Sequence, residues 1–372
     1  MTPSDHDLPP QQPLSSVIEQ LGWQDMSRAH AFSHWLESVR IVHGLSPDSV
    51  RAASADASFR RYFRVNGAAA SLIIMDAPPD KENSQPFVEI AGLMQAAGLL
   101  VPKVLAWDPT LGFMLLDDLG QHTMMQVLDT DHADRNLSFF NRALDALLVW
   151  QQASRPDILP LYDASLLQRE LQLFPDWYVG QYRGKTLDDS QTQQLQQCFD
   201  VLVARNLSAP RVFVHRDFMP RNLMLPANPQ EQRLGVLDFQ DAVHGPITYD
   251  IASLMRDAFI SWDEAFVLDV TVRYWERARQ KGLLGTGELS SDFGLFWREV
   301  EWMGLQRHLK VAGIFARLGL RDHKPKYLAD TPRFVTYIRA TCSRYRELFP
   351  LLRLIDRIEG QANVSGYAFG RV

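Results

Sequence analysis

A short strand-like island inside a mostly helical stretch is the feature that most constrains how this chain can fold. It begins with the apolar triplet at residues 212–214, followed by His215, Arg216 and Asp217 and, five residues after Asp217, by Asn222. A second apolar segment at residues 235–237 leads directly into Asp238. Short apolar runs of this kind predict two buried strands whose following loops carry the polar residues.

The polar side chains on these loops are the types that phosphoryl transfer requires. The reaction needs a positioned acceptor hydroxyl and divalent cations that bridge the nucleotide phosphates. Asp217 offers a carboxylate, Asn222 an amide oxygen and Asp238 a second carboxylate, and Mg²⁺ prefers oxygen ligands. The alternative interpretation makes Asp217 and Asn222 loop-capping residues and Asp238 a turn residue.

The residues before position 120 follow a different sequence pattern from the mostly helical residues around the 212–238 segment. Residues 60–65 and 71–75 predict two strands joined by a hairpin that opens with Asn66-Gly67. We expect two short helices within residues 14–42, a helix over 86–98, and strands over 101–107 and 112–116. Beyond residue 120 the apolar spacing predicts mostly helices, at residues 137–152, 166–178, 190–205, 248–258, 264–280, 293–318 and 334–348. Residues 1–13 are predicted to be a disordered tail.

Charge and composition narrow the functional classes. The net charge is -6, from 38 Lys plus Arg against 44 Asp plus Glu, so the chain lacks the basic footprint of nucleic-acid or anionic-membrane binding. No apolar run reaches the roughly 20 residues of a membrane-spanning helix, and no signal peptide is expected. Cys198 and Cys342 are far apart and lack metal-ligand spacing. We therefore predict a soluble, reduced, cytoplasmic protein.

The loops around Asp217 and Asp238 resemble those of the kinase-like phosphotransferases, the aminoglycoside phosphotransferase and choline kinase group. Residues 54–64, 75–79, 174–178 and 245–254 are similar to the bacterial N-acetylmuramate/N-acetylglucosamine anomeric kinases of cell-wall recycling. The resemblance implies a two-lobed, protein-kinase-like α+β fold, with an antiparallel-sheet N-lobe at residues 14–118 and a larger helical C-lobe at residues 119–372. It further implies a monomer that uses ATP and Mg²⁺ to make an amino-sugar 1-phosphate in peptidoglycan recycling.

The resemblance also implies a role for individual residues. Asp217 is the expected catalytic base, and Asn222 and Asp238 are the expected metal ligands. Supporting roles fall to His215, Arg216 and Asp250. The expected nucleotide-binding residues are Ser58, Arg60, Arg64, Glu89, Asp118 and Leu119. The candidate substrate-binding residues are Asp176, Trp177, Tyr178 and Arg256, with Trp302, Arg307 and His308 as further candidates. The alternative for the aromatic rings is packing in the core, and for the arginines a solvated helix face or an ion pair.

Two departures from the protein-kinase pattern leave alternatives open. Met75 stands where those kinases carry a phosphate-binding Lys, and the residue 54–58 loop replaces G-x-G-x-x-G. We expect Arg60 or Arg64 to supply the missing charge, the alternative being a solvated strand edge. The acceptor could also be an aminoglycoside or an amino alcohol, or the chain could be a catalytically silent nucleotide-binding module. A protein kinase is disfavoured because no A-P-E segment follows Asp238.

Overall fold

The described part of the chain divides into two compact units. The structure, a computed structural model, describes residues 21–23, 25–55, 59–228 and 230–360. The first unit comprises the described residues up to Gln121, with those of Met224–Glu231 and Gly235–Gln240; the second comprises the rest. The expected tail at residues 1–13 and the candidate Ser58 lie outside the described residues. Within the described residues, no helix combines the length and the apolar character that a membrane crossing requires.

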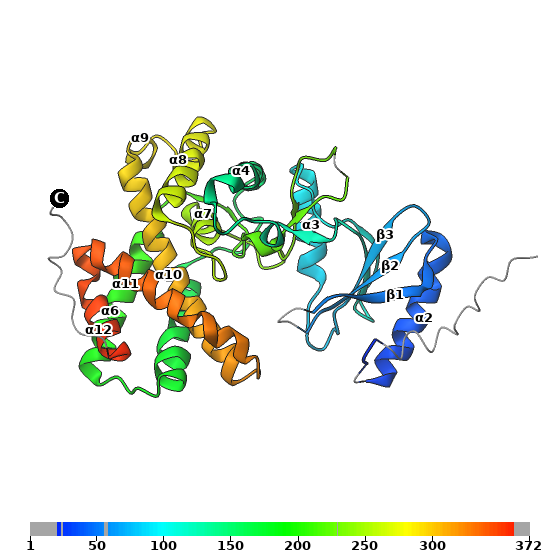
Figure 1. Ribbon diagram of the computed structural model, residues 1–372, viewed down its shortest axis with the longest axis horizontal. Coiled ribbons are helices and arrows are strands. Elements are labelled where there is room, and N and C mark those ends of the chain that lie inside the picture. Colours follow the sequence, from blue (N-terminus) through cyan, green and yellow to red (C-terminus); the bar gives the residue numbers. More distant parts are fainter. Residues whose placement is uncertain (1–20, 24, 56–58, 229, 361–372) are drawn as a thin grey trace, which may run out of the picture. The chain divides into compact units, whose positions relative to one another are not determined.

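The first unit is built on a five-stranded antiparallel sheet of order β1-β2-β3-β5-β4. Its strands are β1 (Ser46–Ala55), β2 (Arg61–Asn66), β3 (Ser71–Asp76), β4 (Val104–Asp108) and β5 (Phe113–Asp117). Figure 1 shows α2 (Met26–His43) along the sheet, where its Phe32, Trp35 and Leu36 pack with the buried Phe63 and Ile74. α3 (Gln85–Ala96) is inserted between β3 and β4.

The hairpin expected at Asn66-Gly67 is confirmed. β2 and β3 pair antiparallel, and the Gly67 N–H donates to the Ala70 carbonyl oxygen at 2.9 Å. Met75 pairs with Tyr62 and is fully buried, so this position of the third strand presents no cation. β1 was not expected from the sequence, because its polar and small residues lack a clean alternation, and its pairing with β2 comes from tertiary structure.

The second unit is mainly helical, with short strands, one of which leads into the loop at residues 215–222. Strand β7 (Arg211–Val214) pairs antiparallel with β10 (Val243–Pro246). The other short strands are β6 (His122–Thr123), β8 (Leu223–Leu225) and β9 (Gly235–Val236). β6 and Leu223 belong to the second unit, whereas the rest of β8 and all of β9 belong to the first. The 3₁₀ segments are η1 (Met124–Gln126), η2 (Ala133–Asn136), η4 (Pro220–Asn222), η5 (Pro325–Asp330) and η6 (Arg346–Leu348).

Helix α10 (Phe293–Leu320) is the long central helix of the second unit (Figure 1). It contacts several of the surrounding helices, among them α5, α6, α7 and α11. The other described helices of this unit are α4 (Leu137–Gln152), α5 (Ala164–Leu173), α6 (Asp189–Asn206), α7 (Thr248–Met255), α8 (Glu264–Gln280), α9 (Glu288–Ser291), α11 (Thr331–Arg344) and α12 (Phe349–Glu359). Its buried face includes Arg307, His308 and Lys310 among apolar residues. Charged side chains in such a place need a specific partner or a function.

The helix expected over residues 166–178 is two elements. α5 ends at Leu173, and a π-helix, η3 (Phe174–Tyr182), continues the chain. Pro175 lies at the start of η3 and has no backbone N–H to donate, so the regular hydrogen-bond ladder of α5 cannot run through it. Apolar spacing alone does not register this change of helix type.

Candidate active site

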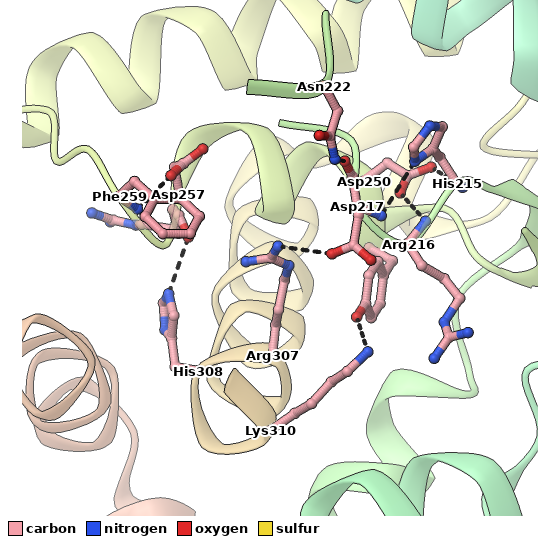
Figure 2. A network of polar contacts seen from close by, with 12 residues as sticks. His215, Arg216, Asp217, Asn222, Asp250, Asp257, Phe259, Arg307, His308 and Lys310 are labelled. Atoms are coloured by element: carbon pink, nitrogen blue, oxygen red, sulfur yellow. Dashed lines mark hydrogen bonds and ion pairs between the residues drawn. The ribbon is translucent and has the colours of Figure 1, made fainter. Parts of the chain in front are cut away.

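The loop that follows β7, at residues 215–222, is held in place by the buried carboxylate of Asp250. The backbone N–H of His215 donates to Asp250 Oδ2 at 2.7 Å, and that of Arg216 donates to Oδ1 at 3.0 Å (Figure 2). Asp250 lies in the first turn of α7 and is fully buried. Burial raises the pKa of this carboxyl to about 7, although both backbone hydrogen bonds act to lower it. The two hydrogen bonds tie the loop to the start of α7.

The loop conformation leaves Asp217 partly exposed, while Arg216 is half-buried and His215 is buried. Arg216 has a φ of 77°, a left-handed conformation that is uncommon for a residue with a side chain. His215 is buried, and its Nδ1 accepts the backbone N–H of Asp217 at 3.3 Å. Asn222 Nδ2 donates to the Asp217 carbonyl oxygen at 2.9 Å. The Asp217 side chain remains 43% exposed, so its carboxylate is available to a substrate.

Three cations surround the Asp217 carboxylate from the protein side. Arg307 Nη2 lies 3.6 Å from Asp217 Oδ1, and Figure 2 shows this guanidinium reaching from α10 toward the loop. Desolvation raises the pKa of Asp217, but the charges of Lys310, Arg307 and Arg216 outweigh it and lower that pKa below its ordinary value. Asp217 is therefore ionised at neutral pH.

Glu170 compensates part of this positive charge. Its Oε1 lies 2.9 Å from Lys310 Nζ and 2.5 Å from Arg216 Nη2. Lys310 Nζ also donates to the Tyr249 hydroxyl at 3.2 Å. Glu170 and Lys310 were not among the residues expected from the sequence. The available signal was the run from Arg307 to Lys310, which places three basic residues inside an otherwise apolar helical stretch.

The two expected metal ligands supply oxygen donors of the kind Mg²⁺ prefers. The hydrogen bond from Asn222 Nδ2 to the loop fixes the orientation of its amide. Asp238 has a φ of 63°, and its Oδ1 accepts Gln240 Nε2 at 2.9 Å. Among the described residues, no group of three or more His, Cys, Asp and Glu side chains could hold a metal alone. Carboxylate and amide oxygens are ligand types that Mg²⁺ accepts beside phosphates and water.

The expected nucleotide-binding residues lie in the first unit, several of them in ion pairs. Arg60 Nη2 lies 3.1 Å from Glu82 Oε2, with the Arg60 side chain only 8% exposed. Arg64 Nε donates to Asp118 Oδ2 at 2.6 Å, and its Nη2 donates to the Gly120 carbonyl oxygen at 2.9 Å. Burial raises the pKa of Asp118, but hydrogen bonds from Arg64 and Ser71 outweigh this and lower it.

Glu89 and Leu119 have different surroundings from these ion pairs. Glu89 is exposed on α3 and accepts a hydrogen bond from Gln85 Nε2 at 2.7 Å. The acid that the structure pairs with Arg60 is thus Glu82, which precedes α3. Leu119 is buried, and a Cβ added to Gly235 would come within 2.8 Å of Leu119 Cδ1. Nothing in the sequence pattern favours Glu82 over Glu89, because Glu82 lies in a turn before the periodic helix.

The expected substrate-binding residues do not share one site. Asp176 lines an open cavity of about 390 Å³ between η3 and α6, and it accepts Gln172 Nε2 at 2.8 Å. The Tyr178 ring is buried, and its hydroxyl donates to Glu359 Oε1 at 2.9 Å. Trp177 is half-buried in η3. Arg256, at the end of α7, lines a different and smaller cavity.

Comparison with known proteins decides the family. The sequence pattern described as "Phosphotransferase enzyme family" matches residues 49–283. This chain belongs to the phosphotransferase enzyme family. The loop at residues 215–222 and Asp238 both lie inside the matched range.

Individual relatives of this phosphotransferase agree with the family assignment. It is 46% identical over 338 residues to an N-acetylmuramate/N-acetylglucosamine kinase of Pseudomonas aeruginosa, covering 89% of this chain and 97% of that protein. It is 44% identical over 347 residues to the protein of the same name from Neisseria meningitidis, covering 92% and 100%. An ADP-bound aminoglycoside phosphotransferase, 13% identical, matches with a TM-score of 0.55 over 83% of this chain and 97% of that one. The expected kinase-like α+β fold is confirmed.

The two ion pairs of this phosphotransferase predict different outcomes for two arginine variants. Arg60→Ala should raise the KM for ATP at least tenfold if Arg60, which follows the residue 54–58 loop in the sequence, replaces the missing Lys at the phosphates. Arg64→Ala should instead lower stability by about 3 kcal/mol, because it leaves the buried Asp118 carboxylate without its cation. Steady-state kinetics and thermal unfolding separate the two effects.

Arg51→Ala provides the matched control for these variants. Arg51 is an exposed arginine of β1 that contacts the Asn66 side chain, and its loss should change neither KM nor Tm measurably. If all three alanine variants kept the ATP KM of the parent protein, neither Arg60 nor Arg64 would replace the strand lysine.

Proposed function

We propose that this protein is an ATP-dependent kinase that phosphorylates the anomeric hydroxyl of N-acetylmuramate or N-acetylglucosamine, giving the sugar 1-phosphate in peptidoglycan recycling. The proposal is carried by the 46% identity to the Pseudomonas aeruginosa N-acetylmuramate/N-acetylglucosamine kinase across 97% of that protein. The braced, solvent-facing Asp217 supplies the chemistry such a reaction needs. The ADP in the structurally similar aminoglycoside phosphotransferase supports an adenine nucleotide as donor.

In the proposed reaction Asp217 is the proton acceptor. The anomeric oxygen bonds to the γ-phosphorus as the bond from that phosphorus to the β–γ bridging oxygen breaks, so ADP leaves. The hydroxyl proton moves to the Asp217 carboxylate. The lowered pKa of Asp217 makes it a weak but fully ionised base. This suits an anomeric hydroxyl, which is more acidic than an ordinary alcohol, so that positioning matters more than basicity.

The remaining parts of the proposal concern the metal, the lobes and the cell. When bound, Mg²⁺ neutralises charge on the nucleotide phosphates, and Asn222 and Asp238 are the residues that would hold it. We assign residues 14–118 to a nucleotide-covering lobe and residues 119–372 to the lobe with the catalytic loop. We further propose that the protein is a monomer and acts in the cytoplasm.

A nucleotide-consumption screen tests the acceptor class. Purified protein with ATP and Mg²⁺ should release ADP with N-acetylmuramate and N-acetylglucosamine at least tenfold faster than with glucose, kanamycin or choline. Mass spectrometry of the product should show a phosphate on the anomeric carbon. Activity with kanamycin or choline alone would remove the amino-sugar assignment and leave the kinase assignment standing. Inactivity with every acceptor would favour a silent nucleotide-binding module.

A further inference from the structure

Three positively charged side chains lie behind the Asp217 carboxylate, and two of them already have a carboxylate of their own. Arg216 Nη2 lies 2.5 Å from Glu170 Oε1, and Lys310 Nζ lies 2.9 Å from the same oxygen. Burial raises the pKa of Glu170, but the charges of Lys310 and Arg216 outweigh it and lower that pKa, so Glu170 is ionised. Arg216 and Lys310 are therefore neutralised in part without Asp217.

Arg307 is the cation of this group that lacks such a partner. Its side chain is only 2% exposed. Within the described part of the chain, Asp217 is the one acid at ion-pair distance from its guanidinium, with Nη2 3.6 Å from Oδ1. Nε and Nη1 are buried and have no hydrogen-bond partner among the described residues. Burial raises the pKa of the nearby Asp257, which the charge of Arg307 opposes, but these two residues form no ion pair.

An arginine in such a place is costly to the folded state. A charge that leaves water loses its hydration, and a distant partner together with two unpaired nitrogens returns little of that loss. An apolar side chain of similar volume would fill the same space in α10, whose buried residues are mostly apolar. Packing therefore does not account for Arg307, whereas its position beside Asp217 does.

The two oxygens of the Asp217 carboxylate have different surroundings. Oδ1 faces the Arg307 guanidinium, as Figure 2 shows. Among the residues that the structure describes, this carboxylate accepts no hydrogen bond and forms no second ion pair. The side chain is partly exposed, so Oδ2 is left for an acceptor hydroxyl. Rotation of a carboxylate about its last bond is soft, and attraction to Arg307 favours the orientation that turns Oδ1 inward.

We propose that Arg307 is a positioning residue for the catalytic base: it attracts Oδ1 of Asp217 and so leaves Oδ2 turned toward the acceptor hydroxyl. The inference rests on the proposed kinase function and gives a role to a side chain that touches neither substrate. Arg307 does not strengthen the base, because a neighbouring cation makes a carboxylate harder to protonate. Orientation is the contribution that fits, since catalysis of phosphoryl transfer is mostly positioning and electrostatic stabilisation.

Replacement of Arg307 should therefore lower kcat and leave substrate binding unchanged. Arg307→Ala should lower kcat about a hundredfold, the loss typical of a reacting group displaced by about 1 Å. The KM values for ATP and for the amino sugar should each change less than about threefold, because Arg307 acts through Asp217. Arg307→Met, which is apolar and fills most of the space, should lower kcat as far while Tm stays the same or rises. Steady-state kinetics and thermal unfolding measure both effects.

Chemical rescue gives a readout that a merely structural role would not move. Arg307→Ala leaves room for a free guanidinium ion beside Asp217, so guanidinium chloride should raise its kcat about fivefold or more. A concentration of about 50 mM is far below the molar range in which guanidinium unfolds proteins. Urea, which has a similar shape and no charge, should not raise kcat. Arg307→Met should not respond to guanidinium, because its side chain occupies the space.

Two control variants make the test specific. Arg317→Ala removes a half-buried arginine about 15 Å further along α10, and it should keep kcat within about twofold and ignore guanidinium. In the Asp217→Asn background, Arg307→Ala should lower the residual kcat less than about threefold, because the base that Arg307 positions is already absent.

The outcomes separate this inference from the proposed function. The inference is wrong if Arg307→Ala keeps the parent kcat, if its defect is a raised KM for the sugar, or if guanidinium restores no more activity than urea. An equally large effect in the Asp217→Asn background would also contradict it. A parent protein that phosphorylates only kanamycin or choline would overturn the amino-sugar assignment alone, and the same variants would then be measured with that acceptor. A parent protein inactive on every acceptor would overturn both proposals.

Discussion

Asp217→Asn is expected to lower kcat by about a thousandfold, within the range typical for loss of a positioned general base. The asparagine side chain has nearly the same shape as aspartate, so the loop held by Asp250 should keep its conformation. What is lost is the carboxylate that accepts the hydroxyl proton. Steady-state kinetics with N-acetylglucosamine at saturating ATP measure the effect.

The control for Asp217→Asn is the exposed acid Glu276 on α8. Glu276→Gln removes a surface charge and should leave kcat within twofold. The KM for ATP and the Tm of Asp217→Asn should stay close to those of the parent protein, although Arg307 loses its anionic neighbour. An Asp217→Asn protein that retained more than a tenth of the parent kcat would show that Asp217 is not the base.

The pH dependence follows from the lowered pKa of Asp217. A lowered pKa means that the carboxylate stays ionised as the pH falls below neutrality, until the pH reaches values under 3.8. Protonation of Asp217 therefore does not explain any loss of activity between pH 5 and 8 in this mechanism. Loss in that range would point to other groups, such as Asp250 and Asp257, because burial raises their pKa values to about 7 and about 6.

The local signals in the sequence were strong enough to predict the elements that carry the proposed chemistry. Of the two segments that flank Asn66-Gly67, one alternates between polar and apolar residues and the other is mostly apolar. They fold as β2 and β3. The apolar triplet before His215 folds as the end of β7, and the loop after it presents Asp217. In each case the deciding information lies within about ten residues, which is the range that periodicity and turn chemistry can describe.

The contacts that surround these elements could not be predicted, because they join residues far apart in the chain. Arg64 could equally have been a phosphate ligand, a solvated cation or a partner of an acid. Its pairing with Asp118 depends on β2 and the end of β5 lying in one sheet. Likewise, Glu170 meets Lys310 only because α5 and α10 pack together. Tyr178 was expected to bind the acceptor sugar. Its hydrogen bond to Glu359 depends on a contact between η3 and the C-terminal helix, which are far apart in the sequence.

Asp238→Asn is expected to lower kcat/KM at fixed Mg²⁺ by about a hundredfold or more. Mutation of a residue that only hydrogen-bonds to a metal ligand already lowers metal affinity or activity about 10–100-fold, and loss of a ligand's charge should cost at least as much. The variant keeps the oxygen that accepts Gln240 Nε2 and removes only the negative charge. The Mg²⁺ concentration for half-maximal activity should rise at least tenfold. Asn222→Ala should act in the same direction, with an added loss from its hydrogen bond to the Asp217 carbonyl oxygen.

Thermal unfolding with ATP separates this metal-dependent role from that of a silent binding module. In the parent protein, ATP with Mg²⁺ should raise Tm by several degrees more than ATP with EDTA, because the nucleotide then binds with its cation. Asp238→Asn should lose that difference, and Asp241→Asn, which alters an exposed acid three residues away, should keep it. If ATP stabilised the parent protein equally with and without Mg²⁺, Asn222 and Asp238 would not hold a metal, and a scaffold that binds nucleotide without transferring phosphate would explain the site better.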